Sequence, residues 1–178
     1  MKGIVIYKGR YGATKQYAAW IGQELELPVA SSDRFPIDQF DQYDYYIIGS
    51  SVYIGKLEIK KWLKNNSSKL VNKKVFFFQV AASPVSEKEK RESYNVAGIP
   101  AELLNKAKSF FLPGRMIKRN LSWWDRFMLK MGARLAKDPV EKTRMLTDFN
   151  EVKQEYITPL IITVKTLTKI NEPKKELV

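Results

Sequence analysis

The sequence predicts an α/β protein of the doubly wound type, with three layers, a five-stranded parallel sheet and a helical insertion before the last helix. Two observations predict it. Continuous apolar runs such as 4–7 and 75–80 are typical of strands buried on both faces of a parallel sheet. Segments with apolar residues at helical spacing separate these runs, and such alternation favours right-handed crossovers. A chain of 178 residues is long enough for one domain of this kind.

The first half of the chain supplies three of the expected strands. Its elements are a strand at 4–7, a helix from about Thr14 with Ala18, Ile21 and Leu25 on one face, a strand at 28–30, a polar connection at 33–41, a strand at 45–48 that stops at Gly49, and a helix marked by Leu57, Ile59, Trp62 and Leu63.

The second half supplies the other two strands. Its elements are the apolar strand 75–80, a polar segment at 86–92, a short helix from Pro100, a strand at 110–112 before the turn Pro113-Gly114, a final helix over 147–168 kinked at Pro159, and a charged tail at 171–178.

Two residue types are absent, and their absence excludes whole classes of chemistry. Without cysteine there are no disulfides, thiolate metal sites or cysteine nucleophiles. Without histidine there is no Ser-His-Asp triad and no histidine base or metal ligand. We therefore expect no metal site, and any redox chemistry must depend on a bound cofactor.

The net charge of +12 is concentrated in one part of the chain. Residues 106–144 contain eleven Lys or Arg and three Asp or Glu. Such a field favours anionic partners such as phospholipid headgroups, nucleic acid or a carboxylate-bearing small molecule, although it could also be a solubilising surface. We expect no nucleic-acid partner, because the basic residues share their segment with an apolar stripe instead of a known binding motif.

The apolar runs of the sequence are too short to span a membrane. No run of about 18 uncharged apolar residues occurs. The apolar run at the N-terminus is also shorter than that of a signal peptide, and no small-residue cleavage site follows it. The expected location is the cytoplasm, including the inner face of the cell membrane.

A loop with two glycines follows the first strand, where a doubly wound sheet binds its ligands. Its glycines let backbone N–H groups approach a phosphate, and the next helix adds free amides and the positive end of its dipole. The spacing fits neither a Walker A loop nor a dinucleotide fingerprint, so an ordinary glycine turn is the alternative. The predicted phosphate-binding residues are Gly9, Arg10, Tyr11, Gly12, Ala13 and Thr14.

This loop resembles that of flavodoxins, which reads Thr/Ser-x-Thr-Gly-x-Thr. Gly12 and Thr14 match the pattern, whereas Gly9 and Tyr11 replace hydroxyl residues. The resemblance implies a flavodoxin-like fold over residues 1–170 with FMN as the cofactor. The two missing hydroxyls remove possible phosphate contacts, for which the charge of Arg10 could compensate.

Flavodoxins also hold the flavin ring with loops after two other strands. The matching stretches here are 50–55 and 81–84. Tyr53 could stack on the flavin or be an ordinary half-exposed aromatic, and small residues in the second loop could let the backbone approach the ring. The residues that the resemblance adds to the cofactor site are Ser50, Ser51, Val52, Tyr53, Gly55, Ala81, Ala82 and Ser83.

The insertion over 115–146 contains the most unusual stretch of the sequence. Ser122 and Asp125 have the spacing of a helix-capping box. Two stripes follow at helical spacing, an apolar one and a basic one. The helix either packs on the domain or meets a membrane surface, a large apolar substrate or a second subunit. The stripes consist of Trp124, Phe127, Met128, Met131 and Leu135, and of Arg126, Lys130 and Arg134.

The run 123–130 resembles the insertion of the flavodoxin-like, quinone-dependent protoporphyrinogen IX oxidases. The resemblance extends to residues 1–25, 45–62 and 147–149. It implies an FMN oxidoreductase of heme biosynthesis that is peripheral to the membrane, with a porphyrinogen substrate and a quinone acceptor. No catalytic acid or base can be carried over. The surface for substrate or partner comprises Trp123, Trp124, Arg126 and Lys130.

Two alternatives remain open at this point. An electron-transfer or flavin-binding protein would share the fold and the FMN but dock a redox partner protein through the basic insertion. A protein that has lost its flavin would serve as a membrane-binding or protein-binding module. Fold alone cannot choose among these functions.

Overall fold

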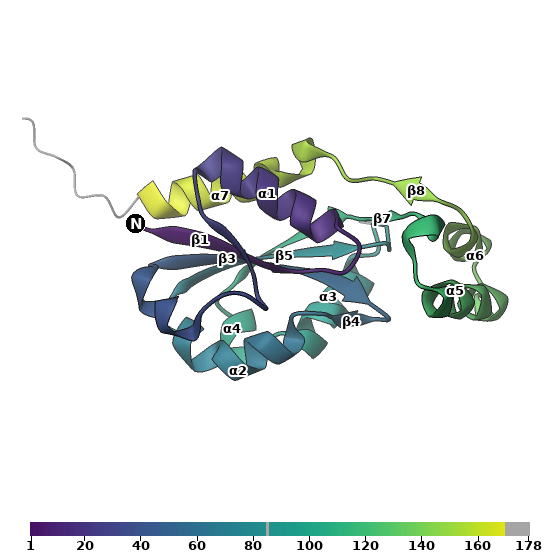
Figure 1. The fold of residues 1–178 in the computed structure, drawn as a ribbon, viewed down its shortest axis with the longest axis horizontal. Helices are drawn as coiled ribbons and strands as arrows, with labels where there is room; N and C mark the ends of the chain where they lie inside the picture. Colours follow the sequence, from purple (N-terminus) through teal and green to yellow (C-terminus); the bar gives the residue numbers. More distant parts are fainter. Residues whose placement is uncertain (85, 170–178) are drawn as a thin grey trace, which may run out of the picture.

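The computed structural model describes residues 1–84 and 86–169 and shows a twisted parallel sheet between two layers of helices (Figure 1). Five parallel strands lie in the order β2-β1-β3-β5-β6, which confirms the predicted doubly wound sheet. Their bounds are β1 Gly3–Lys8, β2 Val29–Ser31, β3 Tyr45–Tyr53, β5 Lys74–Ala81 and β6 Lys108–Pro113.

Helices cover both faces of the sheet and bury it on each side. The apolar runs of the central strands therefore divide between two hydrophobic clusters, one under each layer. In Figure 1 the first and last helices lie above the sheet, and three others lie below it. The bounds are α1 Ala13–Leu25 and α7 Thr158–Lys169 above, and α2 Lys60–Leu70, α3 Lys88–Gly98 and α4 Ala101–Leu104 below.

The third strand is longer than predicted. It does not stop at Gly49 but continues through Tyr53. After Tyr53 the chain reverses direction, and the short antiparallel strand β4, Lys56–Leu57, pairs with the end of β3. Ile54 and Gly55 make the turn with φ angles of 45° and 68°, in the left-handed region that tight hairpins require. The predicted loop 50–55 is therefore mostly strand.

Two predictions on the lower face were also wrong in detail. Leu57 and Ile59 precede the helix they were expected to join, since Leu57 belongs to β4 and Ile59 is the N-cap of α2. Most of the polar segment 86–92 belongs to α3, which begins at Lys88; its many charged residues hide the helical spacing of the few buried ones. The polar connection 33–41 contains most of the 3₁₀ helix η1, Ile37–Gln42.

The predicted final helix over 147–168 was wrong in its first half. Strand β8, Phe149–Asn150, and the 3₁₀ helix η3, Gln154–Ile157, precede α7. Pro159 lies in the first turn of α7 instead of kinking a longer helix, because proline lacks an N–H that this turn does not need. The tail predicted at 171–178 lies outside the described residues.

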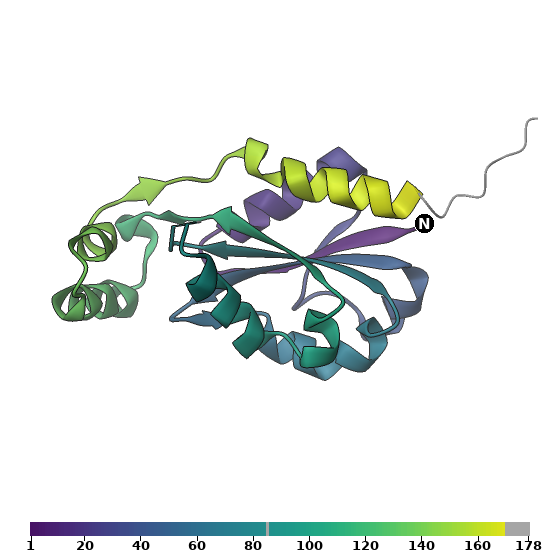
Figure 2. The ribbon, with the colours of Figure 1, turned by 180° about the vertical axis from the view of Figure 1, so that it is seen from behind.

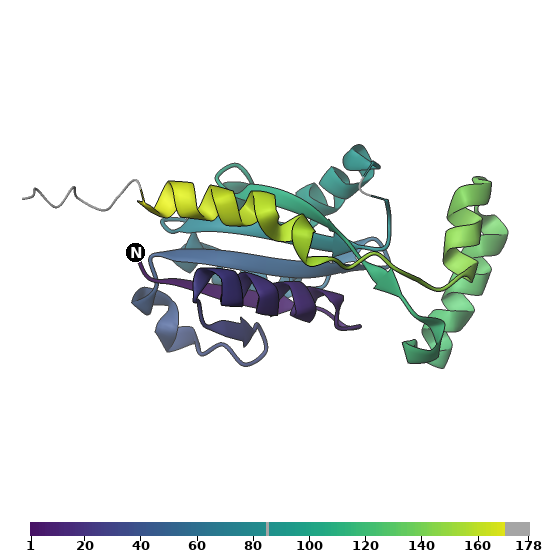
Figure 3. The same ribbon diagram turned by 90° about the horizontal axis from the view of Figure 1, so that it is seen from above.

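The insertion projects beyond the carboxyl ends of the strands, at the end of the molecule opposite the N-terminus (Figures 2 and 3). Its root is a two-stranded antiparallel ribbon, β7 Arg115–Met116 with β8. The ribbon carries the short 3₁₀ helix η2, Lys118–Asn120, and two packed helices, α5 Trp123–Leu135 and α6 Pro139–Leu146. The insertion therefore ends at β8, a few residues beyond the predicted end at 146.

In the described part of the chain, no helix is long and apolar enough to cross a membrane.

Candidate functional site

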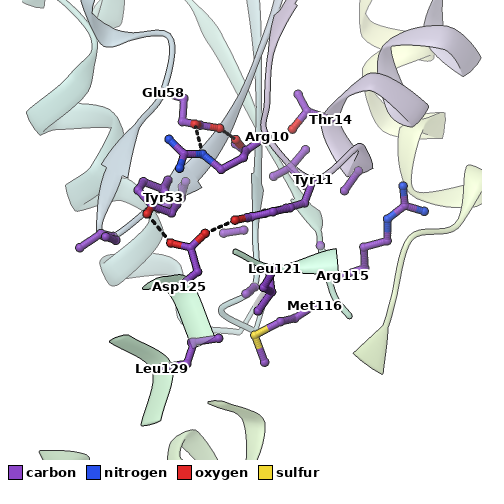
Figure 4. Close-up of a pocket in the computed structure, with 18 of the residues that line it drawn as sticks. Arg10, Tyr11, Thr14, Tyr53, Glu58, Arg115, Met116, Leu121, Asp125 and Leu129 are labelled. Carbon is purple, nitrogen blue, oxygen red and sulfur yellow. Dashed lines mark hydrogen bonds and ion pairs between the residues drawn. The ribbon is translucent and has the colours of Figure 1, made fainter. Parts of the chain in front are cut away.

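A cavity of about 400 Å³ lies between the carboxyl ends of the strands and the insertion (Figure 4). This volume is within the roughly 300–1,000 Å³ of ordinary small-molecule sites. The sheet side of the cavity is lined by Arg10, Tyr11, Ala13, Thr14, Ser51, Val52, Tyr53, Ile54, Glu58, Val80, Ala81 and Ala82. The insertion side is lined by Gly114, Arg115, Met116, Leu121, Asp125, Met128, Leu129, Gly132 and Met145.

The loop from Gly9 to Thr14 forms one wall and leaves polar groups without partners. Gly12 is the N-cap of α1 with a φ of 83°, a conformation that glycine adopts without strain, and no side chain caps the helix. A Cβ built on Gly9 would lie 2.6 Å from Oγ1 of Thr14, so the turn closes tightly over this hydroxyl. Thr14 is 1% exposed, and its Oγ1 has no hydrogen-bond partner among the described residues.

Arg10 turns away from this loop toward the hairpin of β3 and β4. Its Nε donates to Oε1 of Glu58 at 3.2 Å, and its guanidinium carbon lies 3.9 Å from the ring centroid of Tyr53. Glu58 also accepts a hydrogen bond from the hydroxyl of Ser51. The charge of Arg10 is therefore matched by a carboxylate, and one face of the Tyr53 ring is covered by a cation.

Asp125 joins the insertion to the sheet domain. Its carboxylate accepts hydrogen bonds from the hydroxyls of Tyr11 and Tyr53, and the residue is 6% exposed (Figure 4). Its backbone N–H donates to Oγ of Ser122, as the predicted cap requires. We call the group Tyr11, Tyr53 and Asp125 the tyrosine clasp.

The ionisation of the tyrosine clasp follows from these contacts. Burial acts to raise the pKa of Asp125, but hydrogen bonds from Tyr11 and Tyr53 outweigh it and hold this pKa below its ordinary value. Burial and then the hydrogen bond to Asp125 raise the pKa of Tyr11. The hydrogen bond and then burial raise the pKa of Tyr53. At neutral pH the clasp consists of one carboxylate and two neutral phenols.

A buried arginine fixes the loop after β5. Nη2 of Arg91 donates to the carbonyl oxygens of Ala81, Ser83 and Leu112 at 2.8–3.1 Å. Burial lowers the pKa of Arg91 to about 10, which still leaves it a cation at neutral pH. Arg91 therefore holds the wall formed by Ala81 and Ala82 in place without reaching the cavity.

The structure brings most of the predicted site residues together. Nine of them line the cavity, and Ser83 lines a smaller adjoining cavity of about 160 Å³. Gly9, Gly12, Ser50 and Gly55 shape the surrounding backbone and lie outside the lining. The sequence reasoning missed the contributions of the insertion, above all Arg115 and Asp125. The capping-box spacing singled out Asp125 in the sequence, but this spacing indicates only the start of a helix and not that Asp125 belongs to the site.

The predicted partner surface lies on the outside of the insertion. Trp123 is 73% exposed and Leu135 is 78% exposed, and Arg126 and Lys130 are exposed beside them. The apolar stripe of α5 therefore does not pack fully on the domain. We call Trp123, Trp124, Phe127, Met131 and Leu135 the outer face of α5; all are exposed in the structure.

The fold agrees with comparisons to known proteins. A sequence profile described as flavodoxin domain matches residues 4–143. The chain belongs to the flavodoxin domain family. Among solved structures, this flavodoxin-domain protein resembles the flavodoxin, WrbA-like protein from Agrobacterium tumefaciens, with a TM-score of 0.55 and 16% identity over 96% of this chain and 99% of the other. The likeness confirms the predicted flavodoxin-like fold.

Among curated proteins, a similar one is protoporphyrinogen IX dehydrogenase (quinone) from Escherichia coli. The two sequences are 23% identical over 164 residues, which cover 85% of this chain and 91% of the relative. The match therefore spans most of the length of both chains.

Proposed function

We propose that this protein is an FMN-dependent oxidoreductase of the protoporphyrinogen IX dehydrogenase (quinone) type. The observation that carries the proposal is the cavity, because it joins an uncapped helix N-terminus to a largely apolar space at the carboxyl ends of the strands. The similarity to the Escherichia coli enzyme, over 85% of this chain and 91% of the relative, supports the choice of reaction.

The residues present fit a flavin phosphate. The buried hydroxyl of Thr14 lacks a partner, and the first amides of α1 have no side-chain cap. Together they offer hydrogen-bond donors to an anion at the positive end of a helix dipole. The tight turn at Gly9 leaves no room for a side chain. These features suit the phosphate of FMN, and the apolar lining of the cavity suits its ring.

When bound in the proposed site, FMN would supply the redox chemistry between a substrate and an electron acceptor. The chain's own residues bind and orient. Neutral Tyr11 and Tyr53 keep their protons at pH 7, and ionised Asp125 holds both rings in position. Leu121, Met116 and other apolar side chains of the insertion side limit access of water.

We propose that the outer face of α5 contacts the porphyrinogen substrate and an anionic membrane surface. Arg126, Lys130 and Arg134 lie beside its exposed aromatic residues at helical spacing. Cations could attract the propionates of a porphyrinogen or an anionic lipid surface, and tryptophan suits the boundary between water and an apolar phase. A quinone in such a phase would be the electron acceptor.

The test is anaerobic turnover of protoporphyrinogen IX by protein reconstituted with FMN, with menaquinone or ubiquinone as the acceptor. We expect oxidation of the porphyrinogen that requires both FMN and quinone. Protein without FMN, and FMN without protein, are the controls. A fully flavin-loaded protein that leaves the porphyrinogen unoxidised would disprove the substrate assignment.

A second candidate function is electron transfer to or from a protein partner. The exposed, cation-bearing outer face of α5 favours it, since such a surface also suits docking to an acidic protein. Bound FMN that is reduced by a flavodoxin reductase, without porphyrinogen turnover, would support this candidate. A colourless protein that does not bind added FMN would exclude both candidates and favour a binding module without flavin.

A further inference from the structure

We propose that Arg115, at the root of the insertion, is the side chain that recognises the flavin phosphate, in place of Arg10 in the phosphate loop. The inference rests on the proposed FMN site and adds a residue to it. It begins from the different surroundings of two arginines that line the same cavity.

Arg10 already has partners within the protein. Its guanidinium pairs with Glu58 at 3.2 Å and lies over the ring of Tyr53. To reach a phosphate at the start of α1 it would have to abandon both contacts and leave the Glu58 carboxylate without its cation. Because Glu58 is largely buried, with 13% of its side chain exposed, that exchange would be costly.

Arg115 lies next to the phosphate loop and has no such engagement. A Cβ built on Gly12 would lie 2.9 Å from Nη2 of Arg115, so the guanidinium is in contact with the N-cap of α1. Among the described residues the side chain of Arg115 takes part in no hydrogen bond or ion pair, although it is only partly exposed; its backbone pairs with Asn150 in the ribbon of β7 and β8. Figure 4 shows Arg10 and Arg115 on opposite sides of the Tyr11 side chain.

The groups around Gly12 complement a dianion. The free amides at the start of α1 and the buried hydroxyl of Thr14 supply neutral donors, and Arg115 supplies a charge with several N–H donors. This arrangement replaces the hydroxyl side chains of the flavodoxin pattern, since Gly9 has no side chain and the hydroxyl of Tyr11 is bound to Asp125. It also makes the phosphate a link between the sheet domain and the ribbon of β7 and β8.

The inference predicts selectivity for FMN over riboflavin, which has the same ring without the phosphate. The experiment measures dissociation constants for both ligands by quenching of flavin fluorescence, on wild-type protein, Arg115→Gln and Arg10→Gln. We expect Arg115→Gln to weaken FMN binding by about 10- to 100-fold, as for loss of a charge-assisted contact, and to leave riboflavin binding unchanged. Arg10→Gln should leave the ratio of the two constants at its wild-type value.

Riboflavin binding serves as the control for folding, and Arg115→Lys is the conservative variant. The lysine should recover part of the selectivity, because it keeps the charge without the planar fork. Raising the salt concentration should weaken FMN binding to wild type more than to Arg115→Gln.

Three results would overturn the inference. Unchanged binding of both ligands by Arg115→Gln, with selectivity lost in Arg10→Gln instead, would transfer the role to Arg10 and leave the FMN proposal intact. Equal weakening of both ligands in Arg115→Gln would assign Arg115 a structural role only. Wild-type protein that binds neither ligand would overturn the proposed function itself, and the inference with it.

Discussion

The sheet domain and the insertion bury their aromatic residues to very different extents. Phe76, Phe77 and Phe78 of β5 are at most 1% exposed, whereas Trp123 and Phe127 of α5 are 73% and 47% exposed. The sheet domain is stabilised by its own core. The insertion is held by the β7–β8 ribbon and the tyrosine clasp, and it keeps an apolar surface exposed. Large exposed apolar patches of this kind mark sites of interaction.

The largest expected effect compares the same substitution in the two regions. Phe78→Ala removes a fully buried ring and should lower the free energy of unfolding by about 3–5 kcal/mol. Phe127→Ala should change it by less than about 0.5 kcal/mol, because the ring is half exposed. Chemical denaturation followed by circular dichroism measures both. Similar losses in the two variants would mean that the outer face of α5 is covered in solution, by a second copy of the chain for example.

The next effect concerns the attachment between the regions. Asp125→Asn removes the charge that both tyrosine hydroxyls contact, and should weaken the docking of the insertion by about 1–2 kcal/mol. Hydrogen exchange of residues 115–150 should become faster, while exchange in β5 stays unchanged. Asp38→Asn, at an exposed carboxylate in η1, is the matched control. Equal exchange in the two variants would show that the ribbon alone holds the insertion.

A smaller effect is the pH dependence of the same attachment. The pKa of Asp125 is lowered by folding, so its contribution is complete above the unfolded value of about 4 and is lost as pH falls through the folded pKa. The pKa values of Tyr11 and Tyr53 are raised, so their contribution is complete below about 10 and is lost at higher pH.

The stability difference between wild type and Asp125→Asn should therefore be constant from about pH 5 to 9 and shrink as the solution becomes more acidic than about pH 4. Thermal unfolding at a series of pH values measures it. A difference that grows on acidification would contradict the ionised state of Asp125.

Sequence reasoning predicted the sheet domain well because its pattern is local. The apolar runs of β1 and β5 indicate that these strands are buried on both faces, and the spacing of apolar residues in α1 indicates which side of this helix is buried. The errors fell where contacts distant in sequence decide the structure. The pairing of β3 with β4 extends that strand, and the pairing of β7 with β8 replaces the first turns of the expected last helix.

The residues of the candidate site likewise fall into those that local sequence predicts and those that only distant contacts bring there. The phosphate loop could be predicted because it follows a strand and contains glycines at a recognisable spacing. Arg115 and Asp125 could not be assigned to it, because they approach the loop only through the fold of the insertion, about a hundred residues later in the chain. Arg10 lies in the loop, but Glu58 and Tyr53 draw its side chain elsewhere.

The central claim is that the cavity between sheet domain and insertion binds FMN. Hydrogen exchange of the protein titrated with FMN tests it most directly, since it reports on both walls at once. We expect one FMN per chain, with slower exchange at residues 9–14, at 50–55 and in the insertion at 115–132. Saturation with FMN that leaves exchange unchanged in the insertion, or no FMN binding at all, would contradict it.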